Sequence, residues 1–400
     1  MGRRPITCLC LASFFKGQRL LAAYKEMGCH TIVVATSNLQ NRPWPRDAID
    51  ELYFVPEMDN LPNLLKAVSY LARSRRIDLV VPLEEYMVEK AAVVRGHLGC
   101  PGMCESTARQ VRDKYTMRRR ARECGIAVPD FELVLNHEAV GRFLHTVDPP
   151  WLLKPRSEGG AVQILKLHSS QDAWEAIHSL GDAQSSHLLE SYVAGDVYHV
   201  DSITDRGEVL LAVANRYWSP PFDVWHGGGV FMSETVPSTE PVHADLLGLN
   251  RRILATMGVE RGVSHVEFIR ARDTGTLHFL EIGARVAGAH LDRLTLASTG
   301  VDLFREAARL ELSFLNGDPY RLPETSSGSA GLVLCLSRDE RPDLSSYRSQ
   351  EIVWRLQEDH HAGLVLASPK PERIRALMEE YGRHFREEHL AVLPPAAKPA

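Results

Sequence analysis

The chain has 400 residues, and its 46 basic and 51 acidic side chains give a net charge of −5. This charge supplies no broad basic field of the kind that nucleic-acid binding requires. The length suits two or three domains, no apolar stretch approaches a membrane span, and the seven scattered cysteines argue against a disulfide framework. We therefore expect a cytoplasmic protein that binds neither nucleic acid nor membrane.

The first part of the chain alternates short apolar strands with helical stretches, which is typical of an open parallel α/β sheet. Strands are predicted at residues 6–12, 31–36, 52–55 and 77–82. The turn at 13–17, between the first strand and its helix, lacks the spaced glycines of a dinucleotide-binding turn, so we do not predict NAD binding there. We assign residues 1–105 to this first domain.

Residues 106–320 mix strands and helices, which favours α+β units with antiparallel sheets. Residues 107–123 are predicted to form one basic helix. Another helix is predicted at residues 302–312. Further elements are predicted as strands at 131–135, 151–154, 162–167, 187–190, 198–203 and 209–213, and as a helix at 172–180.

The C-terminal part, residues 321–400, is predicted to be a small lobe. A stretch with proline and serine at 322–329 is typical of a linker. A strand at 330–336 and a helix at 371–387 follow, and the lobe carries no motif that indicates a function.

Two glutamates, Glu267 and Glu281, lie at equal distances from residue 274 in the turn sequence Asp-Thr-Gly. A centre on one residue predicts a three-residue turn with a left-handed glycine, so the two glutamates should face each other across a hairpin. Their Cβ atoms would lie about 5 Å apart, where two carboxylates repel by roughly 3 kcal/mol at an effective dielectric of about 20. A divalent cation such as Mg²⁺ would relieve this repulsion. The alternative is an exposed hairpin with solvated glutamates.

A positive group follows the second glutamate. Arg285 lies four residues beyond Glu281, after the small residues Gly283 and Ala284, which let the backbone approach a ligand. An arginine there can offer a fixed fork to phosphate, so the hairpin is interpreted as a metal–nucleotide site. Three histidines flank these strands and are expected to be packed or supporting residues rather than ligands: His265, His278 and His290.

A phosphate-binding pattern comes earlier in the chain. Lys154 ends an apolar strand and precedes a loop of small residues that includes Gly159 and Gly160. Glycines free backbone N–H groups to point at anionic oxygens, and the lysine neutralises charge. The alternative is a solvated turn, because the Walker pattern is absent.

Two other segments are candidates for ligand contact. Residues 187–195 present Glu190 and exposed backbone near Val193 between two strands, which suits a flat heterocycle. In residues 215–229 aromatic side chains, an arginine and glycines cluster, and this segment is predicted to set substrate specificity. Its candidate residues are Arg216, Trp218, His226 and Gly228. The alternative is a surface loop folded over its own aromatic side chains.

The order of these groups resembles the ATP-grasp carboxylate–amine ligases over residues 1 to about 320. The groups that carry the resemblance are Lys114, Lys154 with its glycines, Glu190, Glu267, Glu281 and Arg285. The resemblance implies a Rossmann-like first domain and, within 106–320, two lobes that clamp ATP, with a mobile lid at about 125–195. The predicted fold class is therefore α/β and α+β, an ATP-grasp fold followed by a small C-terminal lobe.

The resemblance also implies roles for single residues. The ATP-binding set comprises Lys114, Lys154, Gly159, Gly160, Glu190, Val193, Asp196 and His199. Within this set the lysines would contact phosphate, 157–161 would form a mobile loop, and 190–193 would contact adenine. Glu267 and Glu281 would bind magnesium, with Mn²⁺ as an alternative cation, and Arg285 would be the catalytic arginine that steadies the transferred phosphate.

Two positions depart from the pattern of this family. Gly283 stands where an asparagine is frequent, so one metal or water contact must come from elsewhere. Similar Glu-x-Gly-Ala-Arg runs occur in ligases that join amino acids. Val197 stands where a ribose-binding glutamate is usual, so Asp196 or His199 is expected to hold the ribose.

The implied activity uses ATP and Mg²⁺ to convert a small carboxylate, such as an amino acid, into an acyl phosphate that an amine then attacks. Amide or peptide bond formation would release ADP and phosphate. One alternative passes the activated acid to biotin or a thiol, and another is a nucleotide-binding regulator without turnover. The partners expected are thus a small carboxylate and an amine, and a homodimer is left open.

Overall fold

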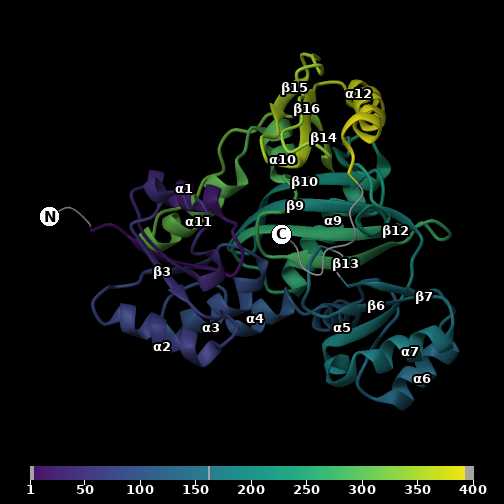
Figure 1. Ribbon diagram of the computed structural model, residues 1–400, viewed down its shortest axis with the longest axis horizontal. Helices are drawn as coiled ribbons and strands as arrows, with labels where there is room; N and C mark the ends of the chain where they lie inside the picture. The colour runs from purple at the N-terminus through teal and green to yellow at the C-terminus, as the bar shows by residue number, and fades with distance from the viewer. Residues whose placement is uncertain (1–3, 161–162, 392–400) are drawn as a thin grey trace.

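The computed structural model describes residues 4–160 and 163–391, which are organised by one parallel and two antiparallel β-sheets (Figure 1). The mixture of a parallel α/β sheet with antiparallel α+β sheets confirms the predicted fold class. None of the helices in the described ranges is long and apolar enough to cross a bilayer.

The first sheet is parallel and has the strand order β3-β2-β1-β4. Its strands are β1 (Thr7–Ala12), β2 (His30–Thr36), β3 (Glu51–Val55) and β4 (Leu79–Pro82). Helices α1 (Gln18–Glu26) and α11 (Leu303–Asn316) pack on one face, and α2 (Leu61–Ala72) and α3 (Val88–Leu98) pack on the other. Because helices cover both faces, β1 is wholly buried and appears in the sequence as a continuous apolar run.

Helix α11 comes from the later part of the chain, yet it lies beside α1 on the first sheet (Figure 1). Ala308 and Leu312 of α11 join the same core as Leu21 and Tyr24 of α1. The segment that follows the glutamate hairpin therefore holds the first sheet against the rest of the molecule.

The second sheet is antiparallel and has the order β5-β8-β6-β7. Its strands are β5 (Phe131–Leu133), β6 (Trp151–Pro155), β7 (Leu165–Leu167) and β8 (His187–Ser191), with helices α6 (His137–Thr146) and α7 (Ser170–Ser179). Trp151, Phe143 and Ile177 belong to the core that these elements share. The two helices lie together at the lower right of Figure 1, at the edge of the molecule.

The third, central sheet has eight antiparallel strands in the order β13-β12-β9-β10-β11-β14-β16-β15. The strands are β9 (Gly195–Asp205), β10 (Glu208–Tyr217), β11 (Phe231–Thr235), β12 (Gly262–Ala271), β13 (Leu277–Gly283), β14 (Ser329–Leu336), β15 (Ile352–Arg355) and β16 (His361–Ser368). The helices around it are α5 (Lys114–Glu123), α8 (Pro221–Gly227), α9 (Pro241–Thr256), α10 (Asp292–Thr299) and α12 (Pro371–His384). The strands of the C-terminal lobe thus extend the central sheet, because β14 pairs with β11.

The predicted single helix at 107–123 is wrong. Helix α4 (Glu105–Gln110) ends first, and α5 begins at Lys114. Asp113 caps α5, because its side chain accepts hydrogen bonds from the Tyr115 and Thr116 backbone N–H groups at 3.0 and 3.3 Å. An aspartate that binds backbone N–H groups competes with a continuous helix, and here it places Lys114 at a helix N-terminus.

Other elements that we did not predict are β11, β15, β16, α6, α8, α9 and α10. Short segments complete the fold: the 3₁₀ helices η1 (Ser37–Leu39), η2 (Arg46–Ala48), η3 (Glu85–Met87) and η4 (Gly181–Ser186), and the π-helical turn η5 (Phe385–His389). Of these, η3 matters most for the site, because it follows β4 at the carboxyl end of the parallel sheet.

Candidate active site

The β12–β13 hairpin brings the two glutamates together. Glu267 stands directly opposite Glu281 in the strand register, as the sequence predicts. Burial lowers the pKa of Arg285, but Glu85 and then both hairpin glutamates raise it, and the raising effects prevail. One guanidinium therefore lies within the electrostatic reach of both carboxylates.

The turn that joins the two strands differs from the prediction. The Ala271 N–H donates to the Thr276 carbonyl at 2.9 Å, so the loop is the even stretch 272–275 rather than a three-residue turn. Gly275 does occupy the left-handed region, with φ of +70°. A bulge at Leu280 restores the alignment, because the register steps from Phe268–Phe279 to Glu267–Glu281.

Glu267 lies inside a polar group on one face of the central sheet. Its Oε1 accepts a hydrogen bond from the Tyr217 hydroxyl at 2.8 Å and lies 3.3 Å from Nε2 of His265. Burial opposes ionisation of Glu267, but the hydrogen bond and charge of His265, together with Tyr217, outweigh it and lower its pKa. The carboxylate is thus held in its charged form, which is the form that binds a cation.

Glu281 faces the start of α5. Its Oε2 lies 3.0 Å from Nζ of Lys114, and that ammonium group also donates to the backbone carbonyl of Glu158. Lys114 therefore connects the hairpin to the loop after β6. The two predicted phosphate-binding segments, Lys114 and the glycine loop, meet at this point.

Arg285 lies just beyond β13 and contacts the first sheet. Its Nε donates to Oε2 of Glu85, on η3, at 2.9 Å, and Nη2 contacts the same oxygen. Arg112 pairs with the other oxygen of Glu85. Burial raises the pKa of Glu85, but Arg285 and then Arg112 outweigh this effect, so its pKa lies well below the usual range. Glu85 thus holds two arginines at the site.

The glycine loop lies over the same charged groups. Arg112 donates to the Ser157 carbonyl, and a Cβ on Gly159 would come within 3.3 Å of a Glu85 carboxylate oxygen. Gly160 has φ of +69°, a conformation that favours glycine. Ala161, the last residue of the predicted loop, lies outside the described residues.

Lys154 and Glu190 pair with each other in the interior. Lys154 Nζ contacts Oε2 of Glu190, and the Arg118 Nε donates to Oε1 at 2.6 Å. Burial raises the pKa of Glu190, but Arg118 and then Lys154 lower it by more than burial raises it, so the carboxylate is charged. In this arrangement the side chains of Lys154 and Glu190 satisfy each other, and their contacts with ATP stay a prediction.

The predicted adenine and ribose residues lie in different environments. Val193 is half-buried against the core that contains Leu291, and Asp196 is exposed on β9. His199 is fully buried and bonded to Asp201, so its side chain does not reach the surface. Of the two ribose candidates, the structure leaves Asp196 accessible.

The tentative specificity residues do not join the glutamate pair. Side chains alternate along β10, so Tyr217 faces Glu267 whereas Arg216 lies on the other face, paired with Glu234 at 2.5 Å. Trp218 packs against the C-terminal core. His226 is exposed, bonded to a backbone carbonyl of α8, and Gly228 follows that helix with φ of +68°. Their assignment to substrate binding stays a prediction.

Sequence reasoning missed several residues of the site, namely Glu85, Arg112, Arg118, Asp201 and Tyr217. Glu85 had a usable signal, because it follows the carboxyl end of a predicted parallel strand, where ligands of α/β sheets bind. Arg118, Asp201 and Tyr217 lie inside a helix or strands, and Arg112 lies in the turn between α4 and α5. Only the packing shows which partners these four side chains contact.

The donor set fits a hard divalent cation. Mg²⁺ takes one or two carboxylates and completes its shell with water and phosphate oxygens. Glu267 and Glu281 are opposed carboxylates, so together they offer the oxygen ligands that such a cation takes, with Lys114 beside Glu281.

No family model matches the chain. Among curated proteins it is similar to the L-arginine-specific L-amino acid ligase of Bacillus subtilis, with 23% identity over 281 residues. The match covers 68% of this chain and 65% of that ligase, and thus less than two thirds of its length.

Two of the solved structures that share the fold illustrate the likeness. The L-amino acid ligase from Bacillus licheniformis superposes with a TM-score of 0.74 at 15% identity, over 98% of this chain and 99% of that one. A biotin carboxylase domain from Hydrogenobacter thermophilus, solved with MgADP, ADP and bicarbonate, superposes with a TM-score of 0.68 at 17% identity, over 93% and 88%. At these identities the structural likeness defines the fold.

The sheet arrangement and these structural matches show that the chain has the ATP-grasp fold. Its similarities in sequence and in fold both include L-amino acid ligases.

Proposed function

We propose that the protein is an ATP-dependent ligase that joins a small carboxylate, such as an amino acid, to an amine. The observation that carries the proposal is the register pair of Glu267 and Glu281, with Lys114 and Arg285 beside it. These groups are what phosphoryl transfer requires, namely carboxylates for a metal and cations for the phosphates. The relation to L-amino acid ligases supports an amino acid as the acid.

The residues of the chain have distinct roles in this proposal. Mg²⁺ held by Glu267 and Glu281, or Mn²⁺ in its place, would neutralise the triphosphate of ATP. Lys114 and the backbone N–H groups of the glycine loop would bind phosphate oxygens, and Lys154 would join them once it exchanges its contact with Glu190. Arg285 would steady the transferred phosphate.

The proposed reaction has two steps. A carboxylate oxygen of the acid attacks the γ-phosphorus of ATP, and the bond to ADP breaks to give an acyl phosphate. The amine nitrogen then attacks the acyl carbon, phosphate leaves with the bonding electrons, and the nitrogen loses a proton. The glycine loop, which lies over the site at Ser157 to Gly159, would exclude water that would otherwise hydrolyse the acyl phosphate.

The first experiment is a screen of amino acids and other small acids, singly and in pairs, for phosphate release with mass detection of the product. We expect ADP and an amide or dipeptide only when both an acid and an amine are present. Turnover that needs no amine contradicts the ligase proposal. A product on a thiol or biotin supports the alternative acceptor, and no turnover with any pair supports a nucleotide-binding regulator.

The variant Glu281→Gln tests the metal role, because an amide keeps the shape of the side chain and removes its charge. We expect turnover to fall at least about a hundredfold, since the cation would lose one of two carboxylates. Glu208→Gln is the matched control, because Glu208 is exposed at the start of β10 in the same sheet. Equal rates for the two variants would contradict the assigned role.

A further inference from the structure

A network of buried polar side chains leads from Glu267 into the central sheet. Its first members, Tyr217 and His265, both contact Oε1 of Glu267, at 2.8 and 3.3 Å. The other ring nitrogen of His265, Nδ1, lies 2.9 Å from Oδ1 of Asp201. The network therefore links the hairpin strand β12 to its neighbour β9 and to β10, the strand beyond β9.

The network continues beyond Asp201. The Oδ2 atom of Asp201 lies 2.9 Å from Nδ1 of His199, and Nε2 of the His199 ring lies 2.9 Å from the Ser233 hydroxyl on β11. Asn215 adds an amide contact to Oδ2 at 3.3 Å. All four of these side chains are fully buried, so they bond to one another rather than to solvent.

The two oxygens of Glu267 are treated differently. Oε1 takes both contacts, from Tyr217 and from His265. Within residues 4–160 and 163–391, Oε2 accepts no hydrogen bond. The protein thus fixes one oxygen and leaves the other for a ligand, which is the usual arrangement when outer side chains orient a metal-binding carboxylate.

Stability of the sheet does not require such a network. Well-packed apolar residues often replace buried charged groups without loss of stability, whereas a polar network with one partner missing is unfavourable. Another buried pair, Ser202 on β9 and Asn250 on α9, shares one hydrogen bond at 2.8 Å and does not extend to the glutamate pair. The longer network differs from this pair because it ends at the carboxylate of Glu267, one member of the glutamate pair.

We propose that Tyr217, His265 and Asp201 are positioning residues that hold Glu267 in the orientation in which its Oε2 binds the divalent cation. The inference rests on the proposed function, because it takes Glu267 as a metal ligand. Tyr217 and His265 fix the carboxylate directly, and Asp201 fixes His265 from behind.

A rival interpretation is that this buried polar network itself binds a metal ion. One ligand atom from each of His199, Asp201 and His265 lies within 4.8 Å of the others, and all three residues are buried. The Nδ1 atoms of both rings already face Asp201 at hydrogen-bonding distance, and this favours the positioning role. Metal analysis of the dialysed protein separates the two, because one tightly bound transition metal per chain would overturn our inference.

The main test compares two variants that each lose one buried hydroxyl. Tyr217→Phe removes a contact with Glu267, and Ser202→Ala removes the bond to Asn250 on the opposite face of β9. Binding of Mn²⁺ in the presence of ADP is measured by electron paramagnetic resonance, and stability by urea unfolding. We expect Tyr217→Phe to weaken Mn²⁺ binding about tenfold and Ser202→Ala to leave it unchanged, because loss of an outer partner typically costs a metal site this much.

A second variant, His265→Gln, keeps a side chain that can still donate to Glu267 but breaks the link to Asp201. It should weaken Mn²⁺ binding in the same direction. Affinities within twofold of the unaltered protein for both Tyr217→Phe and His265→Gln, or an equal loss in Ser202→Ala, would overturn the positioning role.

Two outcomes separate this inference from the proposed function. If the Mn²⁺ affinities change as expected but no acid and amine pair gives turnover, only the ligase proposal fails. If Glu267→Gln binds Mn²⁺ as tightly as the unaltered protein, Glu267 is not a ligand and the positioning role fails with it.

Discussion

Arg285 and Glu85 form an ion pair between residues 200 positions apart, with Nε donating to Oε2 at 2.9 Å. Glu85 belongs to η3, at the carboxyl end of the parallel sheet, and Arg285 follows the last strand of the glutamate hairpin. The pair therefore joins the first sheet to the central sheet at the candidate site. A contact of this kind would align Arg285, the proposed catalytic arginine, only while both sheets keep their relative positions.

The variant Glu85→Gln removes the carboxylate between two arginines. We expect the free energy of unfolding to fall by about 3 kcal/mol, because buried Arg112 loses its ion-pair partner. The turnover number should fall about tenfold, since Arg285 is no longer held in place. Urea unfolding and steady-state kinetics measure the two effects. Glu89→Gln on α3 is the control, and an equal response of both variants would contradict the prediction.

Glu190→Gln tests the buried group of Arg118, Lys154 and Glu190. Neither cation would keep a charged partner, so we expect the free energy of unfolding to fall by about 3–5 kcal/mol. The control is Glu132→Gln on the neighbouring strand β5, because among the described residues the Glu132 side chain accepts only the N–H of Leu133. Unchanged stability combined with a raised KM for ATP would instead support a direct contact of the Glu190 side chain with adenine.

Gly195→Ala tests the close approach of β9 and β12. A Cβ at Gly195 would lie 2.0 Å from the Arg270 carbonyl oxygen, and backbone on both sides cannot yield. We expect a loss of about 3 kcal/mol in the free energy of unfolding, at the upper end for overpacked sites. Gly248→Ala in α9 is the control, because open space surrounds that position and alanine favours a helix. A stable Gly195→Ala protein would show that the strands are further apart.

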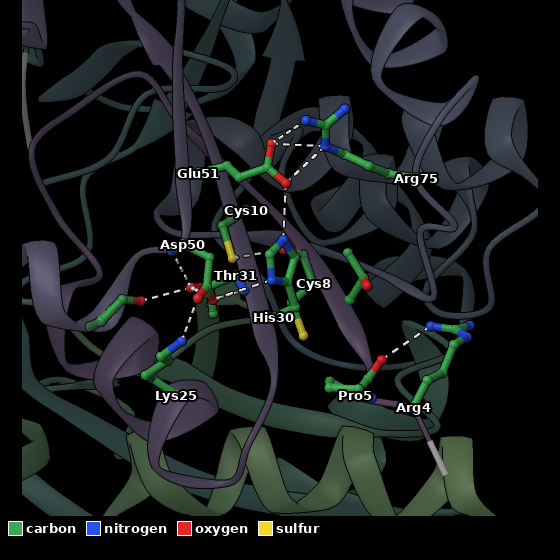
Figure 2. A network of polar contacts seen from close by, with 12 residues as sticks. Arg4, Pro5, Cys8, Cys10, Lys25, His30, Thr31, Asp50, Glu51 and Arg75 are labelled. Carbon is green, nitrogen blue, oxygen red and sulfur yellow. Dashed lines mark hydrogen bonds and ion pairs between the residues drawn. The ribbon is translucent and has the colours of Figure 1, made fainter. Parts of the chain in front are cut away.

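The pH dependence of stability can be traced to Glu51. This carboxylate pairs with Arg75 and contacts His30, and Figure 2 shows it between the two side chains. The Arg75 hydrogen bond is the largest influence, and together with the hydrogen bonds of Tyr53 and His30 it lowers the pKa of Glu51 to about 2 against the opposing effect of burial. Because the folded pKa is depressed, the stabilisation is present above the ordinary carboxylate pKa and is lost as the pH falls toward 2.

The variant Glu51→Gln should therefore differ from the unaltered protein most at neutral pH. We expect a difference of about 1 kcal/mol at pH 7, reduced for solvent screening, that vanishes between about pH 4.5 and 2. Urea unfolding at a series of pH values measures this difference. A difference that stays constant down to pH 2 would show that the ion pair with Arg75 does not cause the shift.

In the glutamate hairpin, the sequence predicted the opposition of the two glutamates correctly but the type of turn incorrectly. The opposition of Glu267 and Glu281 is confirmed, but the reasoning assumed a three-residue turn, whereas the protein combines an even loop with a bulge at Leu280. Both routes give the same alignment. A bulge depends on the packing of both strand faces, so symmetry about residue 274 could not distinguish the two.

The helix predicted at 107–123 shows the opposite case. Its composition suits a helix throughout, and the interruption arises because the Asp113 side chain caps a new helix, while Arg156 pairs with that same carboxylate from the second sheet. The aspartate was visible in the sequence, but its partner was not. Local propensity therefore predicted the helix content, and a distant contact fixed where the helix breaks.

The amino-acid sequence by itself determined the classes of sheet, the order of the charged groups along the chain and the pairing of two glutamates, because periodicity, turn residues and spacing act over short distances. Tertiary structure alone decided which charges meet. Glu85 comes to Arg285, Arg118 to Glu190, and Asp201 to His265, since each pair joins strands or helices that become neighbours only when the sheets assemble. Long-range electrostatic partners depend on that assembly, and no local pattern encodes them.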